Sequence, residues 1–361
     1  MSSTSEPKVV VVVSGWPRVS EVFALNELTA LHEAGMLAAV LALKEGESGP
    51  QHPAAARIGR LVEFVPAGDL RPQADFVGKR AADTGAAAIH GYFAHQPAAV
   101  AAAAARRTGL PFGFSVHALD VRRVSRSDLA DRVRRAALVV SCNGDAAAEV
   151  AAAGGRATLV RHGVDLAGFP ASDRPETQPV SLLAVGRFVE KKGFEVLLRA
   201  LARVERPFRL TLVGDGVLRE RLIALADDLG LADRIRFAGR LTHETLPAAY
   251  AAADLVVVPS IVDSRGDRDG LPNVVLEAMA SRRPVVATDV SAIPSAVRDG
   301  VTGVLVSPGD ITALAAALTG LIDAPAQRRA LGAAGRSRVE AEFGLHRCTR
   351  HFLATLRRAY G

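Results

Sequence analysis

Short apolar runs alternate with longer amphipathic segments along the first half of the chain. A continuous apolar run of strand length, bounded by polar residues, is typical of a parallel strand that is buried on both faces. The runs with this pattern are residues 8–13, 37–43, 61–65, 87–91, 112–115 and 138–141. Helical spacing between several of them, as in residues 97–107 and 145–153, predicts repeated strand–helix units and therefore a doubly wound α/β sheet.

The second half repeats the pattern after residues 171–179 (ASDRPETQP), a polar, proline-containing stretch that we interpret as a linker. The apolar runs expected to form strands there include LLAV, RLTLV, RIRFA, DLVVVPS and RPVVATD. We therefore expect two domains, at residues 1–170 and 180–340, a division that suits a chain of 361 residues.

The composition is that of ordinary globular domains. Hydrophobic residues make up 49% of the chain, enough for a sizeable core, and no run approaches the ~20 continuous apolar residues of a membrane span. The polar start MSSTSEP lacks the pattern of a secretion signal. Cys142 and Cys348 do not have the spacing of a metal or disulfide site. These features predict a reduced, cytoplasmic location.

The net charge of +6 raises the question of an anionic partner. Nucleic acid is not expected, because aromatic residues are not interleaved with the basic ones and there is no basic tail. An anionic substrate and an anionic membrane surface remain as explanations. Six arginines lie between Arg122 and Arg135, offset only by Asp128 and Asp131. They form either a solvated helix face or a peripheral contact with the inner face of a membrane.

The polar loop before a predicted helix is the clearest candidate for a ligand site. Residues 263–281, DSRGDRDGLPNVVLEAMAS, follow the run DLVVVPS, and Pro272 stands where a first helical turn tolerates a missing N–H. In open α/β sheets, ligands bind where such loops leave the carboxyl ends of strands, and a helix N-terminus suits a phosphate. Asp269 and Glu277, with seven residues between them, could therefore contact two parts of one extended ligand.

The two carboxylates also have simpler explanations. An acid just before a helix is favoured by the helix dipole, and this alone would account for Asp269. Glu277 is harder to explain as a solvated residue, because residues 274–276 and 278–279 around it are apolar. An ionised carboxylate in such surroundings requires a partner.

A second glycine-bearing loop carries basic groups. Gly186 permits a turn after an apolar run, and Arg187 and Lys192 behind it could neutralise a diphosphate at the carboxyl edge of the sheet. A basic surface loop is the alternative. Near the start of the chain, Gly15 stands alone between a predicted strand and a helix that begins at Ser20 and Glu21, a pair that equally suits an N-cap and a first-turn acid.

Two predicted strands end in histidine-bearing segments. IHGYFAHQP carries His90 and His95, and FGFSVHALD carries His117 and Asp120. A histidine at the carboxyl end of a buried strand faces the ligand side of the sheet, although a single histidine there more often has a structural role.

The run DGLPNVVLEAMAS resembles the acidic–seven–Glu motif of retaining nucleotide-sugar glycosyltransferases with the GT-B fold, of the group 1 or family 4 type. The resemblance implies two doubly wound Rossmann-like domains that face a cleft, and a C-terminal segment, 341–361, that crosses back to the first domain. It covers nearly the whole chain and is strongest at residues 180–306. The sequence departs from the motif in having Asp269 instead of Glu and in a GDR insertion at residues 266–268, which is similar to the exopolysaccharide-like branch.

The resemblance also implies roles for the candidate residues. In the family the first acid, here Asp269, contacts sugar hydroxyls, and the second, here Glu277, contacts the ribose. The spacing G-R-x-x-x-x-K-G resembles the grip of the family on the diphosphate, which implies that role for Arg187 and Lys192, and the F-S-V-H context places His117 beside the donor sugar. The other donor contacts that it implies are Gly15, Gly186, Gly214, Asp215, Gly239, Gly270 and Leu271.

The activity implied by the resemblance is transfer of a sugar from a UDP- or GDP-type nucleotide sugar to a hydroxyl group, with retention of configuration. The acceptor would be a glycan, a glycolipid or a small molecule, and neither a metal nor a further cofactor is expected. Two alternatives remain open. One is a catalytically silent subunit that binds a nucleotide sugar or glycan, which only Asp269 favours. The other is a GT-B nucleotide-sugar epimerase.

Overall fold

The computed structural model describes residues 6–18, 21–47, 53–117, 119–173 and 178–361, so that Ser20 lies outside the described residues. The chain divides into two compact units. Unit 1 comprises Met1–Gly163 and Leu345–Gly361, and unit 2 comprises Val164–Gly344. The sequence placed the end of the first domain at residue 170 and the start of the second at residue 180, whereas unit 2 already begins at Val164; the expected boundary at residues 340–341 lies four residues before Leu345.

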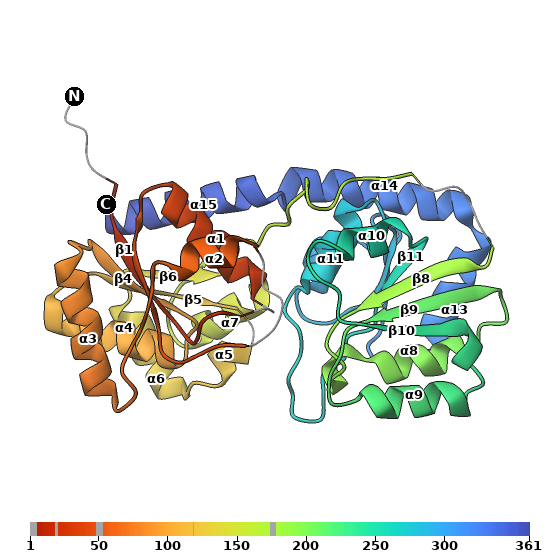
Figure 1. Cartoon of the computed structure of the whole chain (residues 1–361), viewed down its shortest axis with the longest axis horizontal. Coiled ribbons are helices and arrows are strands. Elements are labelled where there is room, and N and C mark those ends of the chain that lie inside the picture. Colours follow the sequence, from red (N-terminus) through yellow and green to blue (C-terminus); the bar gives the residue numbers. More distant parts are fainter. Residues whose placement is uncertain (1–5, 19–20, 48–52, 118, 174–177) are drawn as a thin grey trace. The chain divides into compact units, whose positions relative to one another are not determined.

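Within the described residues, unit 1 contains a seven-stranded parallel sheet in the order β3-β2-β1-β4-β5-β6-β7, of which Figure 1 labels β1, β4, β5 and β6. Its strands are β1 (Val9–Val13), β2 (Leu37–Ala42), β3 (Val62–Phe64), β4 (Ala88–Tyr92), β5 (Phe112–Val116), β6 (Leu138–Ser141) and β7 (Thr158–Leu159). Its helices are α1 (Val22–Glu33), α2 (Pro53–Gly59), α3 (Leu70–Asp83), α4 (Gln96–Thr108), α5 (Leu119–Arg122), α6 (Arg126–Arg135), α7 (Gly144–Ala152) and α15 (Leu345–Tyr360). The strand order reverses between β1 and β4, which is the switch point of the sheet.

The side chains of β1 show why unit 1 has three layers. Val10 and Val12 pack in a core with α3, α4, α6 and α7, whereas Val9, Val11 and Val13 pack in a second core with α1, α2 and α15. Because successive side chains of a strand point to opposite faces, a continuous valine run requires helices on both sides of the sheet. The C-terminal helix α15 supplies part of the second core.

Unit 2 repeats the arrangement around a six-stranded parallel sheet of the described residues, in the order β10-β9-β8-β11-β12-β13. Its strands are β8 (Val180–Val185), β9 (Phe208–Val213), β10 (Ile235–Gly239), β11 (Leu255–Val258), β12 (Val285–Thr288) and β13 (Val304–Val306). Its helices are α8 (Phe194–Leu201), α9 (Arg219–Asp228), α10 (Leu246–Ala251), α11 (Asn273–Ala280), α12 (Ile293–Ala296), α13 (Ile311–Asp323) and α14 (Pro325–Glu342), with short 3₁₀ turns η1 (Glu190–Lys192) and η2 (Ala232–Arg234). Here the strand order reverses between β8 and β11.

The prediction of doubly wound α/β units is confirmed. Helix α11 begins one residue after Pro272 and lies between β11 and β12, as the pattern around the polar loop predicts. The short strand β7 was not predicted, because both of its residues are exposed and carry no apolar run.

A buried polar network anchors the end of α15 to the sheet of unit 1. The imidazole of His90 on β4 lies 2.8 Å from the hydroxyl of Tyr360 and 2.9 Å from the hydroxyl of Ser115. Burial lowers the pKa of His90 to about 3, so its ring is neutral at physiological pH and needs one donor and one acceptor as partners. Gly113 makes room for this contact, since a Cβ atom there would lie 1.9 Å from the Tyr360 hydroxyl.

We expect Tyr360→Phe to lower the free energy of unfolding of unit 1 by about 1–3 kcal/mol, because it leaves one nitrogen of His90 buried without a partner. Trp16 is the single tryptophan of the chain and lies in unit 1, so urea unfolding followed by tryptophan fluorescence measures this unit. Ser115→Ala removes the other partner and should have an effect of similar size. An unchanged midpoint in both variants would contradict a stabilising role for the network.

Candidate functional site

The candidate residues of unit 2 gather at the carboxyl edge of its sheet. Gly186 follows β8, Gly214 follows β9, Gly239 ends β10, and the polar loop with Asp269 follows β11. The loops after β8 and β11 flank the switch point, the position at which open α/β sheets bind ligands. The structure thus brings together loops that are separated by up to about eighty residues in the sequence.

The loop after β8 and the loop after β9 pack so closely that position 214 must be glycine. Gly214 has φ of +138°, and a Cβ atom at this position would lie 1.9 Å from the carbonyl oxygen of Gly186. The N–H of Phe188 donates to the carbonyl of Asp215 (2.8 Å), and the N–H of Gly214 donates to the carbonyl of Gly239 (2.8 Å). Three of the predicted nucleotide-binding loops are therefore held against one another by their backbones.

Lys192 and Asp269 form an ion pair at this edge. Lys192 lies in η1, and its Nζ donates to Oδ2 of Asp269 at 2.7 Å, while the hydroxyl of Ser260 donates to the same oxygen at 3.0 Å. Burial would raise the pKa of Asp269, but the charges of Lys192 and Lys191 and the hydrogen bonds of Lys192 and Ser260 outweigh it and hold the pKa below its ordinary value. Asp269 is therefore ionised and largely buried, with 10% of its side chain exposed.

Glu277 lies on α11, and its partner is a tyrosine. The hydroxyl of Tyr250, on α10, donates to Oε2 of Glu277 at 2.7 Å. Burial raises the pKa of Glu277 to about 7, although the hydrogen bond from Tyr250 and the charge of Lys192 lower it. The carboxyl group is consequently poised between its two protonation states near neutral pH.

The remaining predicted residues of unit 2 lie around this pair. Arg187 is exposed at the start of the loop after β8, while Gly270 and Leu271 are partly buried between Asp269 and α11. Leu271 packs against the core that contains α10 and α11. The carboxylate of Asp215 accepts from the N–H of Gly216 at 2.9 Å, so it stabilises its own turn.

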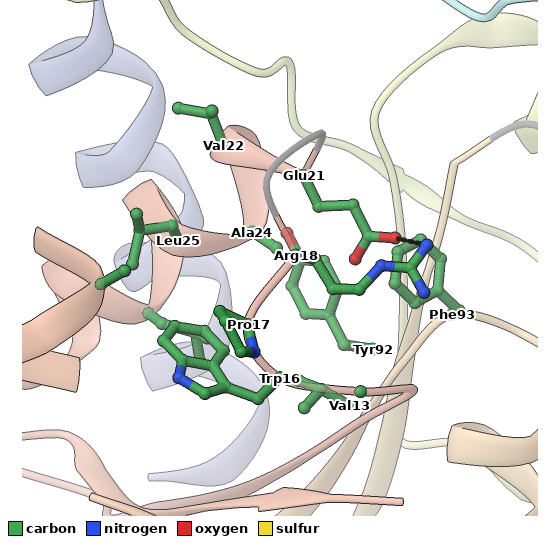
Figure 2. Close-up of a pocket in the computed structure, with 13 residues that line it drawn as sticks. Val13, Trp16, Pro17, Arg18, Glu21, Val22, Ala24, Leu25, Tyr92 and Phe93 are labelled. Atoms are coloured by element: carbon green, nitrogen blue, oxygen red, sulfur yellow. Dashed lines mark ion pairs between the residues drawn. The ribbon is translucent and has the colours of Figure 1, made fainter. Parts of the chain in front are cut away.

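In unit 1, Gly15 lies after β1, at the switch point of that sheet. It lines a cavity of about 30 Å³ whose other lining residues include Trp16, Tyr92, Phe93, Arg18 and Glu21 (Figure 2). Arg18 and Glu21 point toward each other and form an ion pair of 2.9 Å, seen as a dashed line in Figure 2. The lining of the cavity is mostly apolar and includes this charged pair.

His117 lies just beyond β5 inside a cluster of rings. Its ring centroid is 4.7 Å from that of Phe93, 5.0 Å from that of Phe23 and 5.2 Å from that of His162. Burial, followed by the charges of His90 and His95, lowers its pKa to about 3, so the ring is neutral. Among the described residues, Nδ1 of His117 is buried without a hydrogen-bond partner, an unusual state for a buried polar atom.

The other candidates near His117 have structural roles. Asp120 accepts from the N–H of His117 (3.0 Å) and from the N–H of Ala94 (3.0 Å), and thereby joins the ends of β4 and β5. His95 caps α4 by accepting from the N–H of Gln96 at 2.8 Å.

The arginines between Arg122 and Arg135 belong to α5, α6 and the turn between them. Arg132 is partly buried and donates to the carbonyl of Ala94 at 2.5 Å. Arg135 pairs with Asp131 at 2.9 Å, and Arg122 pairs with Glu149 at 3.0 Å. The positive charge of the segment is therefore partly neutralised.

Neither a membrane-spanning helix nor a metal-binding cluster is present among the described residues. No helix there has the length and apolar character that crossing a membrane requires. Nor do those residues contain a group of three or more His, Cys, Asp or Glu side chains arranged to hold a metal ion.

Residues 179–324 match the model of a protein family described as glycosyl transferases group 1. The matched residues all lie within unit 2. Glycogen synthase of Mycobacterium tuberculosis is 36% identical over 190 residues, which are 52% of this chain and 44% of that protein. The amylovoran biosynthesis glycosyltransferase AmsK of Erwinia amylovora is 34% identical over 184 residues, 50% of this chain and 45% of that protein. The matched region thus spans less than half the length of these curated relatives.

The likeness to a solved structure extends over more of the chain than the likeness to these two relatives. The structure of Anabaena HepE in complex with UDP has a TM-score of 0.82 and 21% identity, and the likeness covers 97% of this chain and 100% of that chain. At this identity the likeness concerns the fold, and it confirms the expected class of two Rossmann-like, parallel-sheet domains of GT-B type.

The group 1 match includes four of the candidate residues and excludes one in unit 1. Arg187, Lys192, Asp269 and Glu277 lie inside residues 179–324, whereas His117 lies outside them. The sequence did not indicate several neighbours of the candidate residues: Tyr250, Ser260, Asp267, Phe23 and His162. Four of them belong to no motif that could have indicated the contact. Asp267 lies within the inserted GDR, which could have drawn attention to it.

Proposed function

We propose that this chain is a glycosyltransferase that moves a sugar from a nucleoside diphosphate sugar to a hydroxyl acceptor with retention of configuration. The observation that carries the proposal is the pair formed by Lys192 and Asp269, 2.7 Å apart at the switch point of unit 2. It unites a cation suited to a diphosphate with an ionised carboxylate suited to sugar hydroxyls. The group 1 match over residues 179–324 supports the assignment.

In the proposed reaction the acceptor oxygen bonds to the anomeric carbon on the face from which the diphosphate leaves. The bond between that carbon and the diphosphate oxygen breaks, and the proton of the acceptor hydroxyl passes to the departing phosphate oxygen. Arg187 and Lys192 stabilise the negative charge that develops on the diphosphate. Asp269 and the neutral ring of His117 orient the sugar, while Glu277 holds the ribose.

The structure of HepE contains UDP, so we propose a UDP-linked donor first and a GDP-linked donor second. The test is to incubate the pure chain with UDP- and GDP-sugars, rank binding by thermal shift, and measure release of the free nucleotide. Slow hydrolysis without acceptor, and a product with the anomeric configuration of the donor by proton NMR, are expected.

A catalytically silent binding subunit is the second candidate, because Asp269 is one methylene shorter than the usual Glu. Saturable binding of a nucleotide sugar without any hydrolysis or transfer would favour this candidate. Inversion of configuration would overturn the retaining assignment.

We expect His117→Ala to lower turnover by at least about tenfold, which corresponds to ~1.4 kcal/mol of transition-state stabilisation. Affinity for free UDP should change little, because His117 is assigned to the sugar. His95→Ala is the matched control, since His95 caps a helix and has no proposed role. If turnover of His117→Ala stays near that of the unaltered protein, His117 is a structural residue.

We propose a cytoplasmic location as well, in which the exposed arginines of α6, Arg126, Arg134 and Arg135, form a solvated face. Peripheral contact with an anionic membrane is the alternative. Sedimentation with phosphatidylglycerol vesicles at low and at physiological salt decides between them, with Arg126 and Arg134 replaced by Glu as the control, because both are exposed.

A further inference from the structure

The loop before Asp269 carries a charged pair that the proposed reaction does not use. Nζ of Lys191 lies 3.0 Å from Oδ2 of Asp267 and 3.7 Å from Oδ1 of Asp269. Lys191 therefore stands between two carboxylates and is paired more closely with Asp267. All three side chains are at least three-quarters buried, with exposed fractions of 13%, 23% and 10%.

The backbone of the loop determines where Asp267 lies. Asp263 donates its N–H to the carbonyl of Asp267 (2.9 Å) and accepts the N–H of Asp267 on Oδ1 (2.8 Å). Gly266 has φ of +77°, a conformation that favours glycine in the turn. The loop is also joined to η1, because Glu190 accepts from both the N–H and the hydroxyl of Ser264 at 2.9 and 2.8 Å. The insertion thus presents Asp267 to Lys191 in a defined position.

One carboxylate oxygen of Asp267 is in an unfavourable environment. Its Oδ1 atom is buried and has no hydrogen-bond partner among the described residues. A buried carboxylate oxygen without a partner costs free energy. The other oxygen, Oδ2, forms the ion pair with Lys191, and this is the contact on which the inference below is based.

The two oxygens of Asp269 differ in what they contact. Oδ2 accepts from both Lys192 and Ser260, at 2.7 and 3.0 Å. Oδ1 has Lys191 as a neighbour, but at 3.7 Å the ammonium group is beyond hydrogen-bonding distance. Oδ1 is consequently the oxygen that remains for a ligand hydroxyl.

We propose that Asp267 is a positioning residue that holds Lys191 away from Asp269 and so keeps Oδ1 of Asp269 available to a hydroxyl of the donor sugar. The inference rests on the proposed function, since it assigns Asp269 to the sugar. Without Asp267, the nearest carboxylate for Lys191 is Asp269. An ammonium–carboxylate pair there would displace a neutral hydroxyl, because hydrogen bonds between charged groups are the stronger ones.

The test compares Asp267→Asn in two backgrounds, by calorimetry with UDP and with the UDP- or GDP-sugar that the screen ranks first. In the unaltered background, Asp267→Asn should weaken the sugar nucleotide relative to the free nucleotide by about ten- to a hundredfold, the range for loss of a hydrogen bond to a charged group. Free UDP should bind equally well or more tightly, because a negative charge has been removed beside an anion site. In a Lys191→Gln background, Asp267→Asn should have no further effect, since no ammonium remains to be held.

Ser264→Ala is the matched control, because it weakens the join between the loop and η1 without changing a charge. An equal loss in the Lys191→Gln background would overturn the inference and indicate direct contact of Asp267 with the ligand. Equal weakening of free UDP would also overturn it, as would a Ser264→Ala variant that reproduces the whole effect. These readouts measure binding, so an absence of sugar transfer by the unaltered protein contradicts the proposed function and leaves this comparison intact.

Discussion

Replacing both Arg187 and Lys192 by Ala is expected to abolish measurable binding of UDP and GDP while the fold persists. Lys192 lies beside the turn at Gly186, where a Cβ atom would be 3.4 Å from its side chain, and Arg187 is exposed at the same loop. Each hydrogen bond to a charged group contributes about 1.5–3 kcal/mol. Loss of both should therefore weaken binding roughly a hundredfold to ten-thousandfold, at ~1.4 kcal/mol per decade.

The fold should survive because Asp269 keeps its hydrogen bond from Ser260 when Lys192 is removed, and the charge of Lys191 remains 3.7 Å from its other oxygen. Circular dichroism and thermal melting check this point. A variant with Arg203 and Arg206 replaced by Ala changes the net charge equally. These residues contact Thr312 and Asp323, both on α13, rather than the candidate site. Retained affinity in the Arg187 and Lys192 variant would show that the diphosphate lies elsewhere.

The layers of the fold follow from patterns that are local in the sequence. The valine run of β1 is buried on both faces, so its apolar continuity alone predicts a central parallel strand with helices on both sides. The loop after β11 was placed correctly for a related reason, because Pro272 and the helical spacing behind it define the start of α11. Exposed elements such as β7 have no comparable signal, since their hydrogen bonds depend on a neighbouring strand.

The contacts of the candidate site depend on tertiary structure and could be predicted only in part. The apolar residues around Glu277 in the sequence predict that it needs a partner, because an ionised carboxylate among apolar residues is unfavourable. They could not identify Tyr250, which lies on another helix 27 positions away. The pairing of Lys191 with Asp267 was missed for the same reason, because it depends on a turn closed by Gly266.

The two carboxylates of the acidic–seven–Glu pattern are expected to respond differently to replacement. If Glu277 holds the ribose, Glu277→Gln removes a hydrogen bond to a charged group and should weaken free UDP and the sugar nucleotide together, by about ten- to a hundredfold. Asp269→Ala should leave the affinity for free UDP nearly unchanged, because Lys192 remains, and should lower transfer. Asp269→Glu restores the residue usual in the resembling family and measures whether the loop at residues 263–269 is adapted to the shorter acid. If Asp269→Ala weakens free UDP as much as Glu277→Gln does, the two roles have been exchanged.

The pH dependence of UDP binding is a second test of whether the Glu277 carboxylate binds the nucleotide, independent of the affinities of the variants. Its pKa is raised to about 7 by burial, so the group is mostly protonated below pH 7 and ionised above it. Ribose hydroxyls donate to the carboxylate, so affinity should rise with pH through 7 and level off above it, with a fall of up to about tenfold per unit on the acid side. The hydrogen bond from Tyr250 lowers this pKa, and Tyr250→Phe should therefore move the rise to higher pH. In Glu277→Gln the rise attributed to this carboxyl should disappear; if the same curve persists, the titrating group is the nucleotide phosphate or another side chain, and Glu277 does not bind in its ionised form.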